Sequence, residues 1–314
     1  MRTTYINTLT EMARENPKIV CVIGDTGFSV FEDFEKEFKE RFVNVGIAEQ
    51  NFVGFGAGLA AMGLKPYIYN VVSFMTLRAM EQIVLDVCFQ ENPVVMVGVG
   101  GGLAYGNAGP THHAPFDIAM LRVLPNMNII CPADPVEMRA AVLASEHFDK
   151  PLYIRIGRSV DPVVHNPDID FKIGKALKMR DGGDAVLFAT GTMVKDAVKA
   201  CELLKNKGIA VALYSMHTIK PLDEELILAC AGKYKAMFTL EEHSMICGLG
   251  SAVSDVLVRH MDNFSLKFRP FAFPDIFAPV TGSREYLNEL YGVDPVAVAA
   301  GIEETMNHKV EQNF

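Results

Sequence analysis

Short apolar segments alternate with helix-like segments along the chain, and this alternation is the feature that most restricts the fold. In the first half of the 314 residues, apolar runs of strand length are bounded by turn residues. Such alternation is typical of a mainly parallel sheet flanked by helices. The predicted strands are 18–24, 42–46, 65–71, 93–99, 128–132 and 151–156, and the predicted helices are 2–14, 48–62, 75–90, 115–123 and 135–147.

The alternation stops between residues 159 and 183, where prolines and glycines are frequent, and then resumes. Such a stretch is typical of a linker between domains. The second series contains the predicted strands 185–189, 209–214, 235–241 and 267–273. We therefore predict an α/β fold of two domains, each a mainly parallel sheet flanked by helices: residues 1–160, a linker over 161–182, and residues 183–314.

Charge and composition exclude several classes of function. The chain has 29 Lys and Arg against 38 Asp and Glu, a net charge of −9, and no basic stripe, so we expect no nucleic-acid partner. No apolar run is long enough to span a membrane, and the first residues lack the apolar stretch of a signal peptide. The six cysteines form no CxxC pair, which favours free thiols in a reducing compartment. We expect a cytoplasmic protein with no membrane partner and, from the His and Cys spacing, no metal site of its own.

Unusual residues lie directly after predicted strands of the first domain. Asp25 follows strand 18–24, Glu49 follows strand 42–46, and His112 closes the glycine-rich run after strand 93–99. In parallel sheets, ligands bind beyond the carboxyl ends of the strands. These loops are therefore the predicted site.

Glu49 begins a helix that is otherwise small and apolar, and two interpretations stay open for it. The acid can simply complement the positive end of the helix dipole. Alternatively, the glycines at 54, 56 and 58 indicate close backbone packing, and a carboxylic acid at the head of such a buried helix can donate to a ligand nitrogen.

The other candidates also have a structural and a functional interpretation. The run 98–109 contains no Lys or Arg and fails the phosphate-loop pattern. A loop histidine at the end of a strand seldom has a packing role, which favours function for His112. Phe74 is by default a core aromatic. Arg155 either faces solvent or pairs with an acid, whereas Arg158 at the strand exit is placed to bind an anion.

Four motifs in the same order resemble the transketolases, and in particular the C-terminal subunit of a split transketolase. Residues 1–160 resemble the pyrimidine-binding domain and residues 183–314 the C-terminal domain of that family. The motifs are NVGIAEQN at 44–51, RAMEQI at 78–83, GPTH at 109–112 and IRIGR at 154–158.

The resemblance implies thiamine diphosphate as cofactor and assigns roles around it. Glu49 would hydrogen-bond the aminopyrimidine ring and so help this ring to act as the internal base. Phe74 would stack on the pyrimidine, and Val71 stands where the family has a first aromatic residue. His112 would transfer a proton to the substrate oxygen, and Asp25 corresponds to an acid close to the cofactor.

The resemblance also implies a sugar phosphate-type substrate and a partner chain. Arg158 would bind the phosphate, with Ser29 assisting. Thiamine diphosphate enzymes hold the diphosphate and its Mg²⁺ or Ca²⁺ at a Gly-Asp-Gly…Asn site, which Gly24-Asp25-Thr26 with Asn51 only imitates. We therefore expect an N-terminal subunit that carries this site, in an α2β2 heterotetramer.

Two positions depart from the family and leave the substrate open. Ala108 stands where the family has an aspartate that reads the substrate's C2 hydroxyl, and Gly100 replaces a substrate-binding histidine. A site that lacks its polar partners discriminates poorly between substrates. Asn107 and Tyr105 are the neighbours that could take over these contacts.

The function predicted is two-carbon ketol transfer from an anionic ketose to an aldose acceptor. The alternatives are the β subunit of a 2-oxo acid dehydrogenase, an acyloin condensation like that of 1-deoxyxylulose-5-phosphate synthase, and a catalytically inactive regulatory subunit. Residues 78–82 and 109–112 favour the transketolase, and deoxyxylulose-phosphate synthases are usually one long chain.

Overall fold

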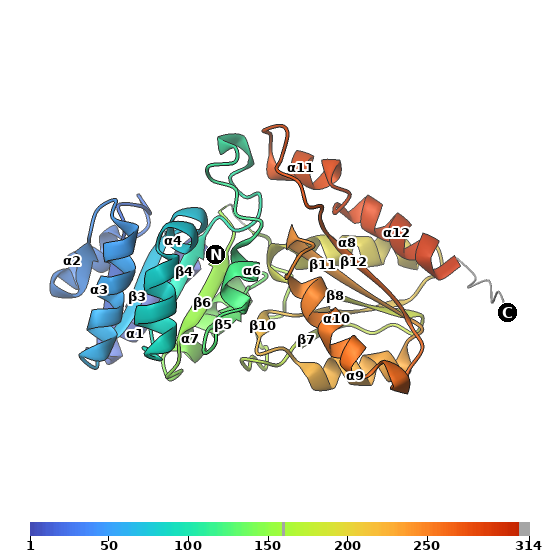
Figure 1. Ribbon diagram of the computed structural model, residues 1–314, viewed down its shortest axis with the longest axis horizontal. Helices are drawn as coiled ribbons and strands as arrows, with labels where there is room; N and C mark the ends of the chain where they lie inside the picture. Colours follow the sequence, from blue (N-terminus) through green and yellow to red (C-terminus); the bar gives the residue numbers. More distant parts are fainter. Residues whose placement is uncertain (159–160, 308–314) are drawn as a thin grey trace.

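Two α/β units lie side by side along the molecule, each built on one sheet (Figure 1). The structure, a computed structural model, describes residues 1–158 and 161–307. It confirms the predicted fold class, because both sheets are mainly parallel and flanked by helices. The predicted domain ends at 160 and 314 lie outside the described residues.

The first sheet has seven strands, and its neighbouring strands run parallel except at one edge, where β10 is antiparallel to β5. Their order is β10 (Thr218–Lys220), β5 (Asn128–Ile130), β6 (Leu152–Ile156), β4 (Val95–Val99), β3 (Lys65–Val71), β1 (Ile19–Ile23) and β2 (Phe42–Asn44). The helical elements around it are α1 (Arg2–Glu15), α2 (Glu32–Glu37), η1 (Lys39–Arg41), α3 (Glu49–Ala61), α4 (Val72–Arg78), α5 (Met80–Gln82), the π-helical η2 (Ile83–Phe89), η3 (Gly106–Ala108), α6 (Asp117–Arg122) and α7 (Pro135–Ser145).

The second sheet has five strands and is also mainly parallel, with β7 antiparallel at the edge. Their order is β12 (Lys267–Phe273), β11 (Ala236–Ser244), β8 (Ala185–Ala189), β9 (Val211–Ser215) and β7 (Leu177–Arg180). Its helical elements are η4 (Gly191–Met193), α8 (Val194–Lys205), α9 (Glu224–Lys233), α10 (Leu249–Arg259), η5 (Met261–Asn263), α11 (Arg284–Leu290) and α12 (Pro295–Asn307).

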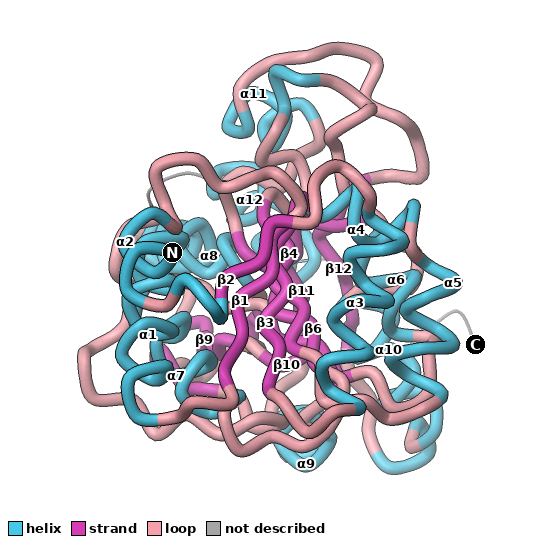
Figure 2. The backbone as a smooth tube through the Cα atoms, turned by 90° about the vertical axis from the view of Figure 1, so that its left-hand side faces the viewer, coloured by secondary structure: helices cyan, strands magenta, loops and turns pink. Residues whose placement is uncertain are grey.

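Helices cover both faces of the strands, as the tube in Figure 2 shows. On one face, a single apolar cluster runs from α3, α4 and α6 of the first unit to α9 and α10 of the second. On the other face, α1 and α7 pack on the first sheet, and α8, α11 and α12 pack on the second. Because one core continues through both units, the packing supports a fixed relation between them.

The structure differs from the sequence prediction in three elements. Strand β7 lies inside 161–182, the stretch predicted as a linker, and β10 from the second half of the chain joins the first sheet. Both are short edge strands, which apolar periodicity detects poorly. The helix predicted over 75–90 is divided into α4, α5 and η2, because Ala79 between the first two has φ −108° and ψ 25°. All six cysteines are free thiols, five of them buried and Cys247 half-buried.

Candidate active site

The predicted site residues meet at one edge of the first sheet. Strands β1, β2, β3, β4 and β6 are parallel, so their carboxyl ends lie at the same edge. The candidates lie at or after the ends of these strands: Asp25 and Ser29 after β1, Glu49 after β2, Val71 at the end of β3 and Phe74 in the following α4, Asn107 and His112 after β4, and Arg158 after β6.

Glu49 is a buried carboxylate in an ion pair. It is the first residue of α3 and is only 3% exposed. Its Oε2 accepts a hydrogen bond of 2.9 Å from an η-nitrogen of Arg78, whose side chain is 55% exposed. Helix α3 approaches β3 closely at Gly56, where a Cβ would lie 2.7 Å from Ile68, whereas Gly54 and Gly58 have room. The close packing inferred from three glycines therefore rests on one of them.

Aromatic rings and two arginines form a continuous row beside Glu49. Arg78 lies over the ring of Phe74 at 5.5 Å, and this ring meets His112 edge-on at 5.1 Å. On the other side of His112, the ring of Tyr105 lies 5.7 Å away. The guanidinium of Arg158 covers Tyr105 at 4.6 Å. The structure thus brings three predicted residues, Phe74, His112 and Arg158, into one row (the aromatic row) that also contains Tyr105 and Arg78.

The half-buried rings of the aromatic row differ in their polar surroundings. Oγ1 of Thr111 lies 2.9 Å from Nδ1 of His112, so this ring nitrogen has a local partner. Burial raises the pKa of the Tyr105 phenol, and the positive charge of Arg158 opposes this rise. Arg158 itself is exposed, which leaves its guanidinium free to meet an anion from solvent.

Asp25 and Ser29 lie at the same edge in a loop of their own. Both have left-handed backbone, with φ of 51° and 61°. The backbone N–H of Asp25 donates to Asn44 Oδ1 at 3.0 Å, and Asn44 Nδ2 donates to Asp25 Oδ1 at 3.2 Å. The N–H of Ser29 donates to Glu32 at 2.6 Å. These bonds hold the loop to its neighbours and not to the aromatic row.

Val71 and Asn107 have different surroundings from the aromatic row. Val71 is 6% exposed and belongs to the apolar cluster against which Phe74 packs. Asn107 is exposed in the turn η3, next to the exposed Ala108. Of these two, only Asn107 presents a polar side chain at the edge of the sheet.

Three further residues at or near the site had no predicted role or an undecided one. Arg78 stands four residues after Phe74 on one helix, a spacing that places two side chains on the same face and could have revealed it. Tyr105 is one of few bulky side chains in a glycine-rich loop. Arg155 pairs with the buried Asp117, its Nε donating to Oδ2 at 2.8 Å, so the ion-pair interpretation was the correct one.

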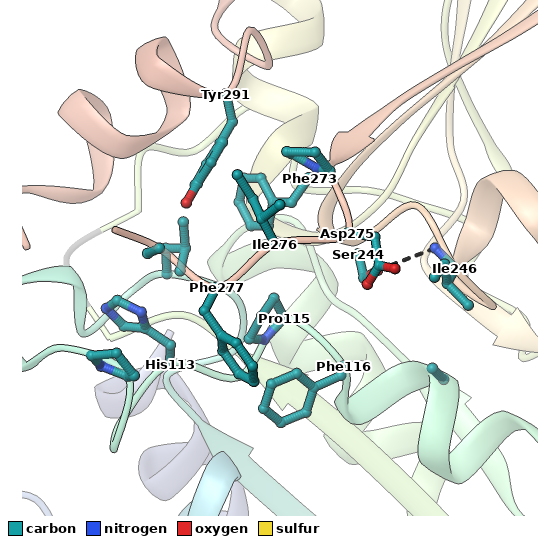
Figure 3. A pocket seen from close by; sticks show the side chains of 15 residues that line it. His113, Pro115, Phe116, Ser244, Ile246, Phe273, Asp275, Ile276, Phe277 and Tyr291 are labelled. Atoms are coloured by element: carbon teal, nitrogen blue, oxygen red, sulfur yellow. Dashed lines mark hydrogen bonds between the residues drawn. The ribbon is translucent and has the colours of Figure 1, made fainter. Parts of the chain in front are cut away.

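An apolar cavity of about 300 Å³ lies beside the loop that carries His112, between the two units (Figure 3). His113 and Phe116 line it from the first unit, and Phe273, Phe277 and Tyr291 line it from the second. None of the eight predicted site residues is among its lining residues. The cavity and the aromatic row are therefore separate features, since no residue of the row lines the cavity.

Membrane-spanning helices and metal-binding clusters are both absent from residues 1–158 and 161–307. No helix there is long and apolar enough to cross a membrane. Within the same residues, no group of three or more His, Cys, Asp or Glu side chains could hold a metal ion.

Comparison with known proteins identifies the class to which this two-domain fold and its sheet-edge site belong. Residues 1–161 match the transketolase pyrimidine binding domain, and residues 174–298 match the transketolase C-terminal domain. The chain belongs to the transketolase family, whose members of this kind are transferases. Within that family it corresponds to the C-terminal subunit of a split transketolase.

Three similar proteins illustrate this placement. An apulose-4-phosphate transketolase subunit of Phocaeicola vulgatus is 41% identical, and the match covers 82% of this chain and 83% of the relative. The 6-deoxy-6-sulfo-D-fructose transketolase subunit SqwH of a Clostridium species is 34% identical, and the match covers 98% of this chain and 95% of the relative. A solved split-gene transketolase, an inactive β4 tetramer, superposes with a TM-score of 0.87 at 37% identity and covers 97% of both chains.

The match to single-chain relatives covers about half of their length. For the 1-deoxy-D-xylulose-5-phosphate synthase of Syntrophotalea carbinolica, 37% identical, it covers 96% of this chain and 47% of the relative.

Proposed function

We propose that this chain is one half of a thiamine diphosphate-dependent transketolase that moves a two-carbon ketol unit from an anionic ketose to an aldose. The observation that carries the proposal is the aromatic row next to the buried carboxylate of Glu49, at the sheet edge of a transketolase-family domain. The substrates for which two of the relatives are named carry a phosphate or a sulfo group, which suits the exposed Arg158.

The residues at this edge fit the aminopyrimidine end of the cofactor. Glu49 is buried, and its partner Arg78 is exposed enough to be exchanged for a ligand nitrogen. The side-chain nitrogen of Asn70 is buried without a hydrogen-bond partner, directly beside Gly24 at the end of β1. An orphaned donor of this kind is costly unless a ligand satisfies it.

The cofactor supplies the carbanion chemistry, and the side chains supply position and proton transfer. Glu49 would hold the aminopyrimidine by a hydrogen bond, and Phe74 would pack on its face beside the core residue Val71. Nε2 of His112, opposite the nitrogen that contacts Thr111, would exchange a proton with the substrate oxygen. Arg158 would bind the anionic group of the substrate, and Asp25 would lie near the cofactor.

We place the diphosphate and its Mg²⁺ or Ca²⁺ on a partner subunit. The run Gly24-Asp25-Thr26 departs from the Gly-Asp-Gly pattern that binds them, and the relatives' names describe subunits. The partner is an N-terminal transketolase subunit, and the expected assembly is an α2β2 heterotetramer in the cytoplasm. Ser29 and Asn107 complete the substrate-binding set that we assign to this chain.

A reconstitution experiment tests the proposal. The chain alone, the N-terminal subunit alone and their mixture would be assayed with thiamine diphosphate, Mg²⁺ and a panel of phosphorylated and sulfonated ketoses. We expect ketol transfer by the mixture only. Full transfer by the chain alone would overturn the division between subunits. A stable complex that binds the cofactor but transfers no ketol from any donor would overturn the activity.

A further inference from the structure

The ring of Tyr105 occupies the space that a side chain at position 100 would fill. Gly100 has a φ of +87°, in the left-handed region that favours glycine. A Cβ built on it would lie 2.0 Å and 2.3 Å from two carbons of the Tyr105 ring. The absence of a side chain at Gly100 is therefore what allows the ring of Tyr105 to lie here.

From this position, the ring of Tyr105 contacts two predicted site residues, the polar His112 and the charged Arg158. Its ring centre is 5.7 Å from that of His112, and the guanidinium carbon of Arg158 is 4.6 Å above it. A planar guanidinium stacks on an aromatic face, so the ring limits where the long, exposed side chain of Arg158 can go. The ring therefore contacts both the histidine and the arginine.

We propose that Tyr105 is a positioning and specificity-determining residue. Its ring holds Arg158 at a set distance from His112, and the site then prefers substrates whose tetrahedral oxyanion, a phosphate or a sulfonate, lies that far from the reacting carbon. The assignment of His112 to the reacting carbon rests on the proposed function. The contact between Tyr105 and Arg158 does not.

Kinetics of the assembled two-subunit enzyme test the role of the ring. In Tyr105→Leu, we expect the KM for a phosphorylated ketose to rise about tenfold, because Arg158 loses its aromatic support. The kcat should stay within about twofold, since the lost contact is the same in ground and transition states. Tyr105→Phe keeps the ring and should restore the parent KM, and a ketose without an anionic group should show no change in KM in any variant.

A second variant and a matched control keep the test independent of folding defects at Tyr105. Arg158→Lys keeps the charge at an exposed position but loses the planar group that stacks, so it should raise the same KM. Phe38→Leu removes another half-buried ring that carries an arginine, Arg41 at 4.2 Å, outside the site. It should leave the KM for charged and uncharged donors unchanged.

Binding of inorganic phosphate and of methanesulfonate to the full chain, measured by calorimetry, separates this inference from the proposed function. If Tyr105→Leu and Arg158→Lys weaken this binding while the enzyme transfers no ketol, the result supports the oxyanion site and contradicts the proposed transketolase activity. If Arg158→Lys had the same KM for the phosphorylated ketose as the parent, the inference would be overturned. It would equally be overturned if Tyr105→Phe were as impaired as Tyr105→Leu, or if the KM rose equally for uncharged donors. Weakening of phosphate binding alone would assign the site to phosphate, and weakening of both would assign it to either oxyanion.

Discussion

The carboxylate of Glu49 lies almost wholly out of water, and its partner, Arg78, is more than half exposed. A buried carboxylate costs free energy unless it is paired, whereas an exposed arginine loses little when it returns to solvent. A cofactor nitrogen can therefore take the place of Arg78 at a modest cost. The same exchange would free the cation that now lies over Phe74.

Replacement of Glu49 by Gln should abolish turnover of the two-subunit enzyme and leave its assembly intact. A general acid or base of this kind contributes about 10²- to 10⁴-fold to the rate, and Gln is isosteric but cannot ionise. Steady-state kinetics and size-exclusion chromatography would measure the two effects. Glu37→Gln, which removes an exposed Glu–Arg pair with Arg14, is the matched control and should change neither. Activity within about tenfold of the parent, a barrier change of ~1.4 kcal/mol, would refute the role.

At the scale of elements, the segment that follows the first sheet is tightly held. Asp134 caps α7, and its other oxygen accepts the backbone N–H groups of Val164 and His165 at 2.8 Å and 2.9 Å. The ring of His165 lies between Asp134 and Glu137, with both N–O distances at 3.1 Å. Each ring nitrogen faces a carboxylate oxygen, so both contacts are ion pairs when the imidazole is protonated. The stretch predicted as a linker is therefore fastened to α7.

This anchoring should make stability depend on pH. Burial alone would lower the pKa of His165, but the carboxylates of Asp134 and Glu137 outweigh it and raise this pKa from 6.5 to about 9. Protonation of His165 then stabilises the fold fully below pH 6.5, and this contribution is lost as pH rises through about 9.

We therefore expect His165→Gln to lower the free energy of unfolding by up to about 3 kcal/mol at pH 6. The difference from the parent should shrink between pH 6.5 and pH 9. Denaturant titrations of the full chain at pH 6, 7.5 and 9.5 would measure it. The exposed His147, changed to Gln, is the control and should follow the parent at each pH. A difference that stays constant with pH would contradict the ion pairs.

The elements also show how far sequence reasoning reaches in this chain. Strand 267–273 is observed at its predicted bounds, because seven apolar-rich residues and their flanking turns carry a strong periodic signal. Strand β10 has only three residues and pairs with β5, which comes from the other half of the chain, so no local pattern reveals it. The same limit applies to the candidate site. The position of Glu49 and His112 in loops after strands predicts them as site residues, but the contact of Tyr105 with Arg158 is made only in three dimensions.

At the scale of the whole molecule, the second unit holds the loop that carries Tyr105 and His112. Oε1 of Glu242, in β11, accepts the backbone N–H of Leu103 at 3.0 Å. The carbonyl oxygen of Glu242 accepts from Arg155 of β6 at 2.9 Å. Farther along the loop, Gly106 and Gly282 are in backbone contact, and in Figure 1 the loop after β4 and the loop before α11 stand next to each other. A defect in the second unit should therefore reach the site through this loop.

Arg284 is the residue that satisfies Glu242 from the side of α11. Both side chains are buried, and Nε of Arg284 donates to the two carboxylate oxygens at 2.9 Å and 2.8 Å. Burial alone would raise the pKa of Glu242, but the charge of Arg284 outweighs it and lowers this pKa. Removing one member of a buried pair leaves the other uncompensated, which is more destabilising than removing both.

Arg284→Met should accordingly lower the free energy of unfolding by about 3 to 5 kcal/mol. The double variant Glu242→Gln with Arg284→Met should recover part of the loss, since the carboxylate charge that Arg284 paired with at position 242 is then removed as well. Chemical denaturation of the two variants and the parent would measure this, and hydrogen exchange would report the N–H of Leu103, which Glu242 accepts. We expect faster exchange there in Arg284→Met. If Arg284→Met lowered the free energy of unfolding by less than about 1 kcal/mol, the pair would behave like an exposed one. This result would contradict the conclusion that the buried network connects the second unit to the site loop.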